Sequence, residues 1–199
     1  MTDAIVDWKR TAILTMDLQN AVVSIYTKNE PEFLSRVANV LKSTRERGIR
    51  VVHVQVGFRP GFPEVDSRNQ LFGAIKTSPQ WQQVFQGSGG AIHADVAPQA
   101  DEVVIIKHRV GAFTGTDLNM ILRANEIDTL ILLGIATSGV VLSTLLHASD
   151  ADYKLLVVKD CCADQDTELH TCLVEKLFPR RATVLSAHEL LEALQSSSG

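Results

Sequence analysis

Cysteines are few in this 199-residue sequence, and long apolar runs are absent. The three cysteines form no Cys-x-x-Cys pair, so a disulfide framework is excluded and a reducing compartment is indicated. No apolar stretch approaches the roughly 18 residues of a membrane span, and the N-terminal segment lacks the apolar centre of a signal peptide. We therefore expect a cytoplasmic protein without a membrane partner.

The chain also lacks a basic run and a glycine-rich nucleotide motif. Its 19 Lys and Arg residues and 23 Asp and Glu residues give a net charge of -4. A nucleic-acid surface needs a basic stripe, so no nucleic-acid partner is expected. Neither Gly-x-Gly-x-x-Gly nor a Walker Lys-Ser/Thr is present, which argues against a nucleotide-binding Rossmann protein.

Short aliphatic runs alternate with longer segments of helical periodicity. The runs predict strands at residues 11–16, 49–56, 102–107, 128–133, 154–158 and 183–186, and the periodic segments predict helices at 31–47, 116–126, 137–151, 166–178 and 187–194. Because the strands are apolar throughout, they indicate a parallel sheet of about six strands with helices on both faces. We expect a single domain over residues 1–199, a Rossmann-like three-layer α/β/α sandwich.

Residues 57–98 interrupt this alternation. The segment is rich in glycine and proline and exceeds the usual length of a loop. We expect it to cover either a site or an interface, with a plain solvent loop as the alternative. Residues 196–199 are expected to form a frayed tail.

Three of the predicted strands end in residues that could carry chemistry. Asp17 follows the first strand, Lys107 ends the third, and residues 134–139 lead from the fourth strand into a helix. Ligands of open α/β sheets bind outside the carboxyl ends of the strands, which makes these positions candidates. Each also has a structural interpretation: Asp17 as a helix cap, Lys107 as a solvent-directed side chain, and the glycine segment as a plain turn.

Taken together, the segments resemble the isochorismatase-like (cysteine hydrolase) superfamily. The matching motifs are Asp17-Leu18-Gln19-Asn20, Lys107-His108-Arg109 followed by Ala112-Phe113-Thr114-Gly115-Thr116-Asp117-Leu118, Gly134-Ile135-Ala136-Thr137, and Asp160-Cys161-Cys162-Ala163-Asp164. The similarity extends over about residues 9–194 in the family's order. It implies the sheet order 3-2-1-4-5-6, which separates Lys107 from Asp17 by roughly 10 Å of sheet.

The resemblance also implies a site. The family's triad corresponds to Asp17, Lys107 and a cysteine nucleophile at position 140, with an oxyanion site around a cis peptide at Ile135–Ala136. The substrate and oxyanion residues expected from it are Gln19, Phe113, Ile135, Ala136, Thr137 and Gly139. No cofactor is implied. No metal is expected either, because Asp66-Ser67-Arg68 stands where metal-dependent relatives carry Asp-x-His.

This sequence departs from the family at the nucleophile. Val140 occupies that position and has no ionisable atom, and no cysteine of the chain can replace it by position. Isochorismatases proper hydrolyse a vinyl ether without a nucleophilic cysteine, with the Asp as general acid, so Asp17 and Lys107 would suffice for such a reaction. A serine replacement from Ser138 or Ser143 is less favoured.

The expected function is therefore hydrolysis of a small molecule, at a vinyl-ether or C–N bond, without a cysteine nucleophile. The alternative is a catalytically silent family member that binds a ligand or serves as an assembly subunit. Val140 keeps this alternative open, whereas retained Asp17 and Lys107 favour the enzyme. The resemblance further implies a homodimer or a higher homo-oligomer.

Overall fold

Six parallel strands form one sheet in the order β3-β2-β1-β4-β5-β6, as predicted. The computed structural model describes residues 6–28, 30–85 and 87–196. The strands are β1 (Thr11–Met16), β2 (Arg50–Val56), β3 (Val103–Lys107), β4 (Thr129–Ile135), β5 (Lys154–Ala163) and β6 (Thr183–Leu185). Every neighbouring pair is parallel, so all the carboxyl ends meet at one edge of the sheet.

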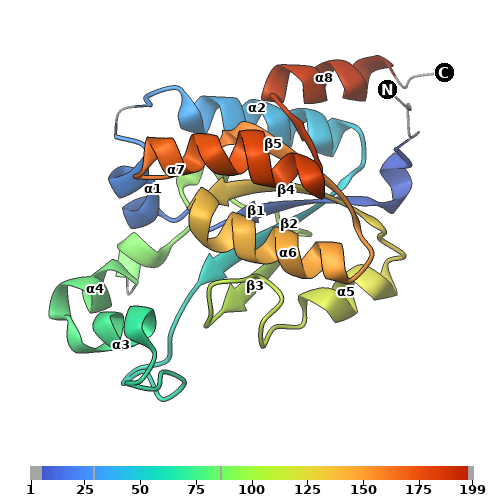
Figure 1. The fold of residues 1–199 in the computed structure, drawn as a ribbon. Helices are drawn as coiled ribbons and strands as arrows, with labels where there is room; N and C mark the ends of the chain where they lie inside the picture. The colour runs from blue at the N-terminus through green and yellow to red at the C-terminus, as the bar shows by residue number, and fades with distance from the viewer. Residues whose placement is uncertain (1–5, 29, 86, 197–199) are drawn as a thin grey trace.

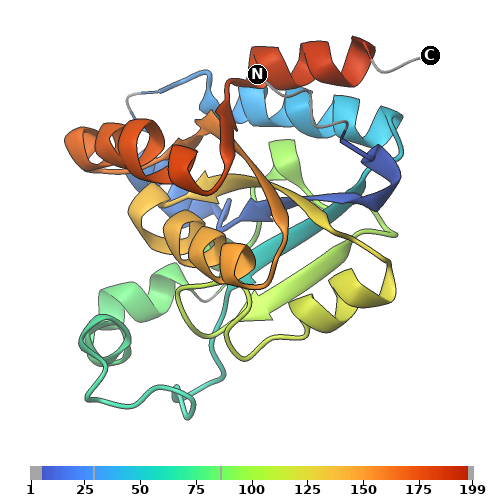
Figure 2. The ribbon, with the colours of Figure 1, turned by 45° about the vertical axis from the view of Figure 1, so that its right-hand side comes forward.

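Helices cover both faces of this sheet (Figure 1). They are α1 (Asn20–Tyr26), α2 (Phe33–Glu46), α3 (Gln70–Thr77), α4 (Pro79–Val84), α5 (Leu118–Ala124), α6 (Leu142–Asp150), α7 (Thr167–Cys172) and α8 (Ala187–Ser196). Figure 2 shows α2 and α8 side by side on one face, with α5 and α6 on the other. Of the tail expected at 196–199, Ser196 ends α8 and the remainder lies outside the described residues.

The core follows the strand pattern. Every residue of β1 and β4 is buried, which is the consequence of helices on both faces. The edge strand β3 differs, because Val104 and Ile106 are 39% and 53% exposed. The flanking helices therefore cover this edge strand only in part.

Several boundaries also differ from the predictions. The strand β5 continues past Val158 to Ala163, with an irregular register against β4 beside Gly134. The predicted helix at 137–151 begins as a π-helical turn, Thr137–Val141, before α6. The 3-residue strand β6 ends one residue before its predicted limit.

The segment 57–98 contains two short helices that its glycines and prolines concealed. Asn69 caps α3 by accepting the Phe72 N–H, and Ser78 caps α4 by accepting the Trp81 N–H, with Pro79 in the first turn. In Figure 1 these helices project from the sandwich, beyond the carboxyl edge of the sheet. Within the described residues, no helix has the length and apolarity needed to cross a membrane.

Candidate active site

Asp17 and Lys107 form a buried ion pair at the carboxyl edge of the sheet. Lys107 Nζ lies 2.8 Å from Asp17 Oδ2, so the lysine side chain bridges the intervening strand β2. Asp17 follows β1 with a left-handed backbone conformation, φ 55°, which turns the chain sharply at the strand end. Gly134 on β4 lies close to the end of β1. A Cβ at this position would clash with the carbonyl oxygen of Met16, so glycine is needed there.

The surroundings of this pair set its protonation. Asp17 is 8% exposed and Lys107 is 2% exposed. Burial raises the pKa of the Asp17 carboxyl, and the charge and hydrogen bond of Lys107 act in the opposite direction. Lys107 Nζ also donates to the Arg109 carbonyl oxygen at 3.2 Å. Its position is thus fixed from two sides.

The two carboxylate oxygens of Asp17 are not equivalent. Oδ2 accepts from Lys107, whereas the buried Oδ1 has no hydrogen-bond partner among the residues that the structure describes. A buried acceptor without a donor is costly, and such atoms occur where a ligand or water completes the bonding. The position of Oδ1 therefore favours a role in binding.

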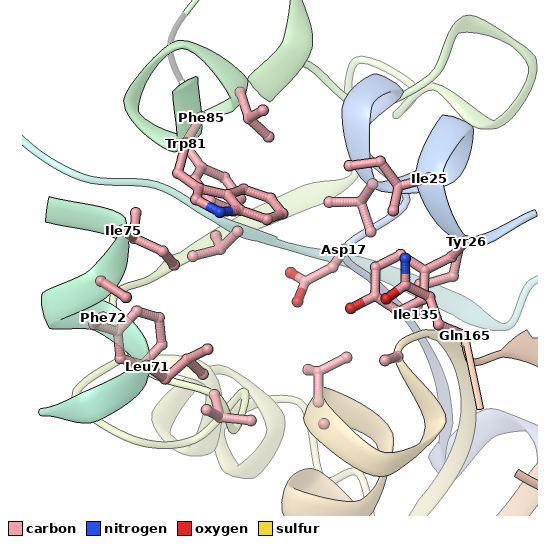
Figure 3. Close-up of a pocket in the computed structure, with 18 of the residues that line it drawn as sticks. Asp17, Ile25, Tyr26, Leu71, Phe72, Ile75, Trp81, Phe85, Ile135 and Gln165 are labelled. Atoms are coloured by element: carbon pink, nitrogen blue, oxygen red, sulfur yellow. The ribbon is translucent and has the colours of Figure 1, made fainter. Parts of the chain in front are cut away.

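A cavity of about 500 Å³ opens beside the pair. Its apolar lining residues are Val22, Ile25, Val56, Leu71, Phe72, Ala74, Ile75, Trp81, Val84, Phe85, Val110, Ile135, Ala136 and Val140. Figure 3 shows the Asp17 carboxylate pointing into the cavity, with Tyr26 and Gln165 on one side and the residues of α3 and α4 on the other. The size and largely apolar lining are typical of a small-molecule site.

The turn between β4 and α6 forms another part of the lining. Ile135, Ala136, Gly139 and Val140 all line the cavity, and the Ile135–Ala136 peptide is cis, as the resemblance implied. Val140 lies on the π-helical turn and is buried. The position that the resemblance assigns to the nucleophile thus lines the cavity in this chain, where Val140 places an isopropyl group.

No other thiol takes over this position. Cys161 and Cys162 are buried in β5, where burial raises the pKa of both thiols, that of Cys162 to about 12. Cys172 is exposed on α7, and none of the three lines the cavity as the structure describes it. The hydroxyl-bearing residues Ser138 and Ser143 are also outside its lining.

Three residues expected at the site have other surroundings. Gln19 is fully buried. Its side-chain N–H groups donate to the carbonyl oxygens of Val56 and Gly90, and its side-chain oxygen accepts the Val56 N–H, so it connects three segments beside the site. Phe113 stacks on His147 with ring centroids 4.5 Å apart. Thr137 is buried and its hydroxyl is 2.8 Å from His170 Nδ1.

None of these three residues is among those that line the cavity in the described part of the chain. A match to a motif fixes where a residue lies along the backbone but not which way its side chain turns. Conversely, Tyr26 and Gln165 line the cavity, although the sequence motifs identified neither of them as a site residue. Burial raises the pKa of the Tyr26 phenol, and the charges of Asp164 and Asp17 raise it further. Tyr26 is therefore a neutral hydroxyl in the site.

The residues offer no arrangement for a metal ion. Among the described residues, no group of three or more His, Cys, Asp or Glu side chains is placed to hold one. The loop with Asp66 and Arg68 forms a local ion pair at 2.8 Å on the surface. The charged side chains in the described lining of the cavity are the carboxylate of Asp17 and the ammonium group of Lys107.

Comparison with known proteins identifies the family. The isochorismatase domain profile matches residues 11–189. The chain is 31% identical over 191 residues to the isochorismatase family protein YecD of Escherichia coli O157:H7, covering 94% of this chain and 97% of the relative. It is 27% identical over 195 residues to a probable inactive nicotinamidase of Arabidopsis thaliana, covering 94% and 97%.

A solved structure with the same fold is the N-carbamoylsarcosine amidase of Thermoplasma acidophilum. The TM-score is 0.72 at 26% identity, and the match covers 89% of this chain and 96% of that one. The strand order, the ion pair at the strand ends and the cis peptide were all implied by the resemblance of the sequence motifs. The chain belongs to the isochorismatase family.

Proposed function

We propose that this protein hydrolyses a small molecule with Asp17 as the acid/base and with water, rather than a side chain, as the attacking group. Members of the isochorismatase family are hydrolases that act on amides and related bonds. The observation that supports the proposal is the buried Asp17 carboxylate, which lines the cavity and points into it, and whose Oδ1 has no hydrogen-bond partner among the described residues. Asp17 can exchange a proton there with a bound molecule or water.

The ion pair gives the two carboxylate oxygens of Asp17 different roles. Lys107 holds Oδ2 at 2.8 Å, so Oδ1 is the atom that transfers the proton. Burial raises the pKa of Asp17 towards the neutral range in which a carboxyl group is effective as both acid and base.

Either expected bond can be broken in this way. At a C–N bond, Oδ1 accepts a proton from water as the water oxygen bonds to carbon, and the proton then passes to the leaving nitrogen. At a vinyl ether, protonated Oδ1 donates to the double-bond carbon, water adds to the resulting oxocarbenium ion, and the proton that the water loses returns to Oδ1. The hemiketal then breaks its C–O bond and gives a carbonyl compound and an alcohol. Asp17 regains its initial state in both cases, and Val140 serves only as a wall of the cavity.

The second candidate is a catalytically silent protein that binds a ligand in the same cavity. Val140 favours it, because the family position of the thiol is occupied by a residue without chemistry. The similarity to a relative named as a probable inactive nicotinamidase points the same way. Retention of a buried ion pair weighs against it, because such a pair is costly to maintain without a use.

Turnover by three forms of the protein separates the candidates. The wild type, Asp17→Asn and Val140→Ala would be incubated with primary amides, N-carbamoyl compounds and vinyl ethers, and products followed by NMR. The hydrolase proposal predicts turnover by the wild type, loss of at least about 100-fold in Asp17→Asn, and most of the rate in Val140→Ala. Binding without turnover of any compound would support the silent protein.

A further inference from the structure

The cavity beside Asp17 has no uncompensated positive charge. Asp17 and Lys107 are the charged residues in its described lining, and they neutralise each other as an ion pair. A guanidinium group does lie nearby, since Arg109 is 6.0 Å from the ring centroid of Phe72. However, Arg109 donates to the carbonyl oxygens of His108 and Glu64, so its hydrogen-bonding groups are directed elsewhere.

The remaining polar groups are neutral or add negative potential. Tyr26, Gln80 and Gln165 line the cavity with a hydroxyl and two amides. Asp164, whose charge raises the pKa of Tyr26, places a further carboxylate near the same end. An anion entering this space would meet the negatively charged carboxylate of Asp17 and would lose its hydration without gaining a cation.

The opposite wall is apolar and partly aromatic. It comes from α3, α4 and the residue after α4, and its members are Leu71, Phe72, Ile75, Trp81 and Phe85 (Figure 3). Trp81 and Phe85 stack on each other with ring centroids 6.3 Å apart, so the wall presents aromatic surface to the cavity. A planar apolar group would be desolvated favourably against it.

We propose that the site selects an uncharged small molecule with two unlike ends: a planar apolar group against α3 and α4, and an N–H or O–H donor for the Asp17 carboxylate. Carboxylate-bearing molecules of the same shape are discriminated against. This inference rests on the proposed function in taking the cavity as the substrate site, and it adds the class of substrate.

Matched amide and carboxylate ligands test the selection directly. Benzamide would be compared with benzoate, and naphthalene-2-carboxamide with naphthalene-2-carboxylate, by titration calorimetry at about pH 8, where both acids are ionised. The amide of at least one pair is expected to bind at least about tenfold more tightly than its carboxylate. Equal binding, tighter binding of the carboxylates, or no binding of any of the four would overturn the proposal.

A pair of charge variants on one helix locates the effect. Gln80 and Gln83 are both exposed on α4, but only Gln80 is among the residues that line the cavity. Gln80→Lys should lower the amide-to-carboxylate preference by at least about threefold, because it supplies the missing cation. Gln83→Lys adds the same charge outside the cavity and should leave the preference unchanged. An equal effect of both variants would contradict recognition in this cavity.

The binding experiment and the turnover experiment test the two proposals independently. If the amides bind preferentially but no compound is hydrolysed, the substrate-class inference stands as a ligand class and the hydrolase proposal fails. If hydrolysis dependent on Asp17 is found but carboxylates bind as tightly as amides, the hydrolase proposal stands and the selection of uncharged molecules is wrong.

Discussion

At the scale of single residues, the asymmetry of Asp17 connects burial to chemistry. One oxygen is bonded to Lys107 and the other is buried without a partner among the described residues. The side chain is therefore held by its bond to Lys107 while the carboxylate lines the cavity. A carboxylate held in this way is prepared for proton transfer without reorganisation of the protein.

Removal of the lysine should expose the cost of burying Asp17. In Lys107→Met the carboxylate loses its counterion, and the free energy of unfolding should fall by about 3 to 5 kcal/mol at about pH 8. The pKa of Asp17 is raised in the folded state. Protonation of Asp17 therefore favours folding, and the free energy of unfolding declines as the pH rises through the folded-state pKa. The loss should therefore be smaller at about pH 5. Urea unfolding at both values measures it.

The double variant Asp17→Asn/Lys107→Met is the control for this prediction, because it contains neither charge. Its difference from the wild type should depend less on pH than that of the single variant. If the single variant is destabilised equally at both pH values, Asp17 is not the group responsible.

Val140 offers a second test at the residue scale. In Val140→Cys a thiol would lie on the turn before α6, beside Asp17 and the charge of Lys107. The start of the helix favours the thiolate, and Lys107 offsets the opposing charge of Asp17, so the pKa of the thiol should lie below the ordinary value of about 8.5. The new thiol should react with iodoacetamide faster than the three native cysteines, and more slowly after Lys107→Met. Reaction no faster than that of exposed Cys172 would count against an intact site.

At the scale of elements, the amino edge of the sheet is fastened by a separate charged network. Glu102, just before β3, accepts two hydrogen bonds from Arg45 on α2, at 2.7 and 2.8 Å, and lies 2.9 Å from His53 Nε2 on β2. Burial alone would raise the pKa of Glu102, but the bonds from Arg45, Gln99 and His53 outweigh it and lower the pKa to about 2. This network stabilises the amino side of the sheet, whereas the candidate site lies at the carboxyl ends of the strands.

The network should contribute to stability in a defined pH range. A depressed carboxyl pKa stabilises the fold fully above the usual value of 4.5 and progressively less as the pH falls towards about 2. Glu102→Gln should therefore lower the unfolding free energy by about 3 kcal/mol at neutral pH, and by less in acid, as measured by urea unfolding. Glu192→Gln on the exposed face of α8 is the matched control and should have little effect at any pH. A constant loss for Glu102→Gln would show that its charge is not involved.

The elements also show which features the sequence could predict. Short aliphatic runs separated by segments of helical periodicity predicted the six strands, and the motifs implied their order. The end of β5 was missed because Lys159 and Asp160 resemble a loop, although Cys161 and Cys162 continue the strand in the interior. The helix α1 and the helices of the segment 57–98 were missed because they are short and are fixed by caps and tertiary contacts.

The candidate site was predictable from the sequence to about the same extent as the fold. Residues at strand ends, such as Asp17, Lys107 and Ala136, could be assigned because parallel strands bring their carboxyl ends together. The aromatic wall could not, because Trp81 and Phe85 reach the cavity through the path of an irregular segment. Side-chain direction, which turns Phe113 away from the cavity, is equally absent from a one-dimensional pattern.

At the scale of the whole molecule, the uncovered part of the sheet leads to a prediction about assembly. Val104 and Ile106 on β3, Met120 on α5 and Leu146 on α6 are large apolar residues exposed to solvent. We expect the protein to form a homodimer or a larger homo-oligomer that covers such residues. Light scattering at micromolar concentration checks this, and Ile106→Lys should lower the mass observed. A monomeric wild type would contradict it.

The central claim is that water attacks the substrate while Asp17 only transfers a proton. Mass spectrometry of a substrate found in the panel, turned over many times in ¹⁸O-labelled water, tests it most directly. We predict that the product gains ¹⁸O, while the intact protein gains no mass and the peptide that contains Asp17 stays unlabelled. A covalent adduct, or ¹⁸O in the carboxylate of Asp17, would contradict the account, because either would mean that a side chain had attacked the substrate.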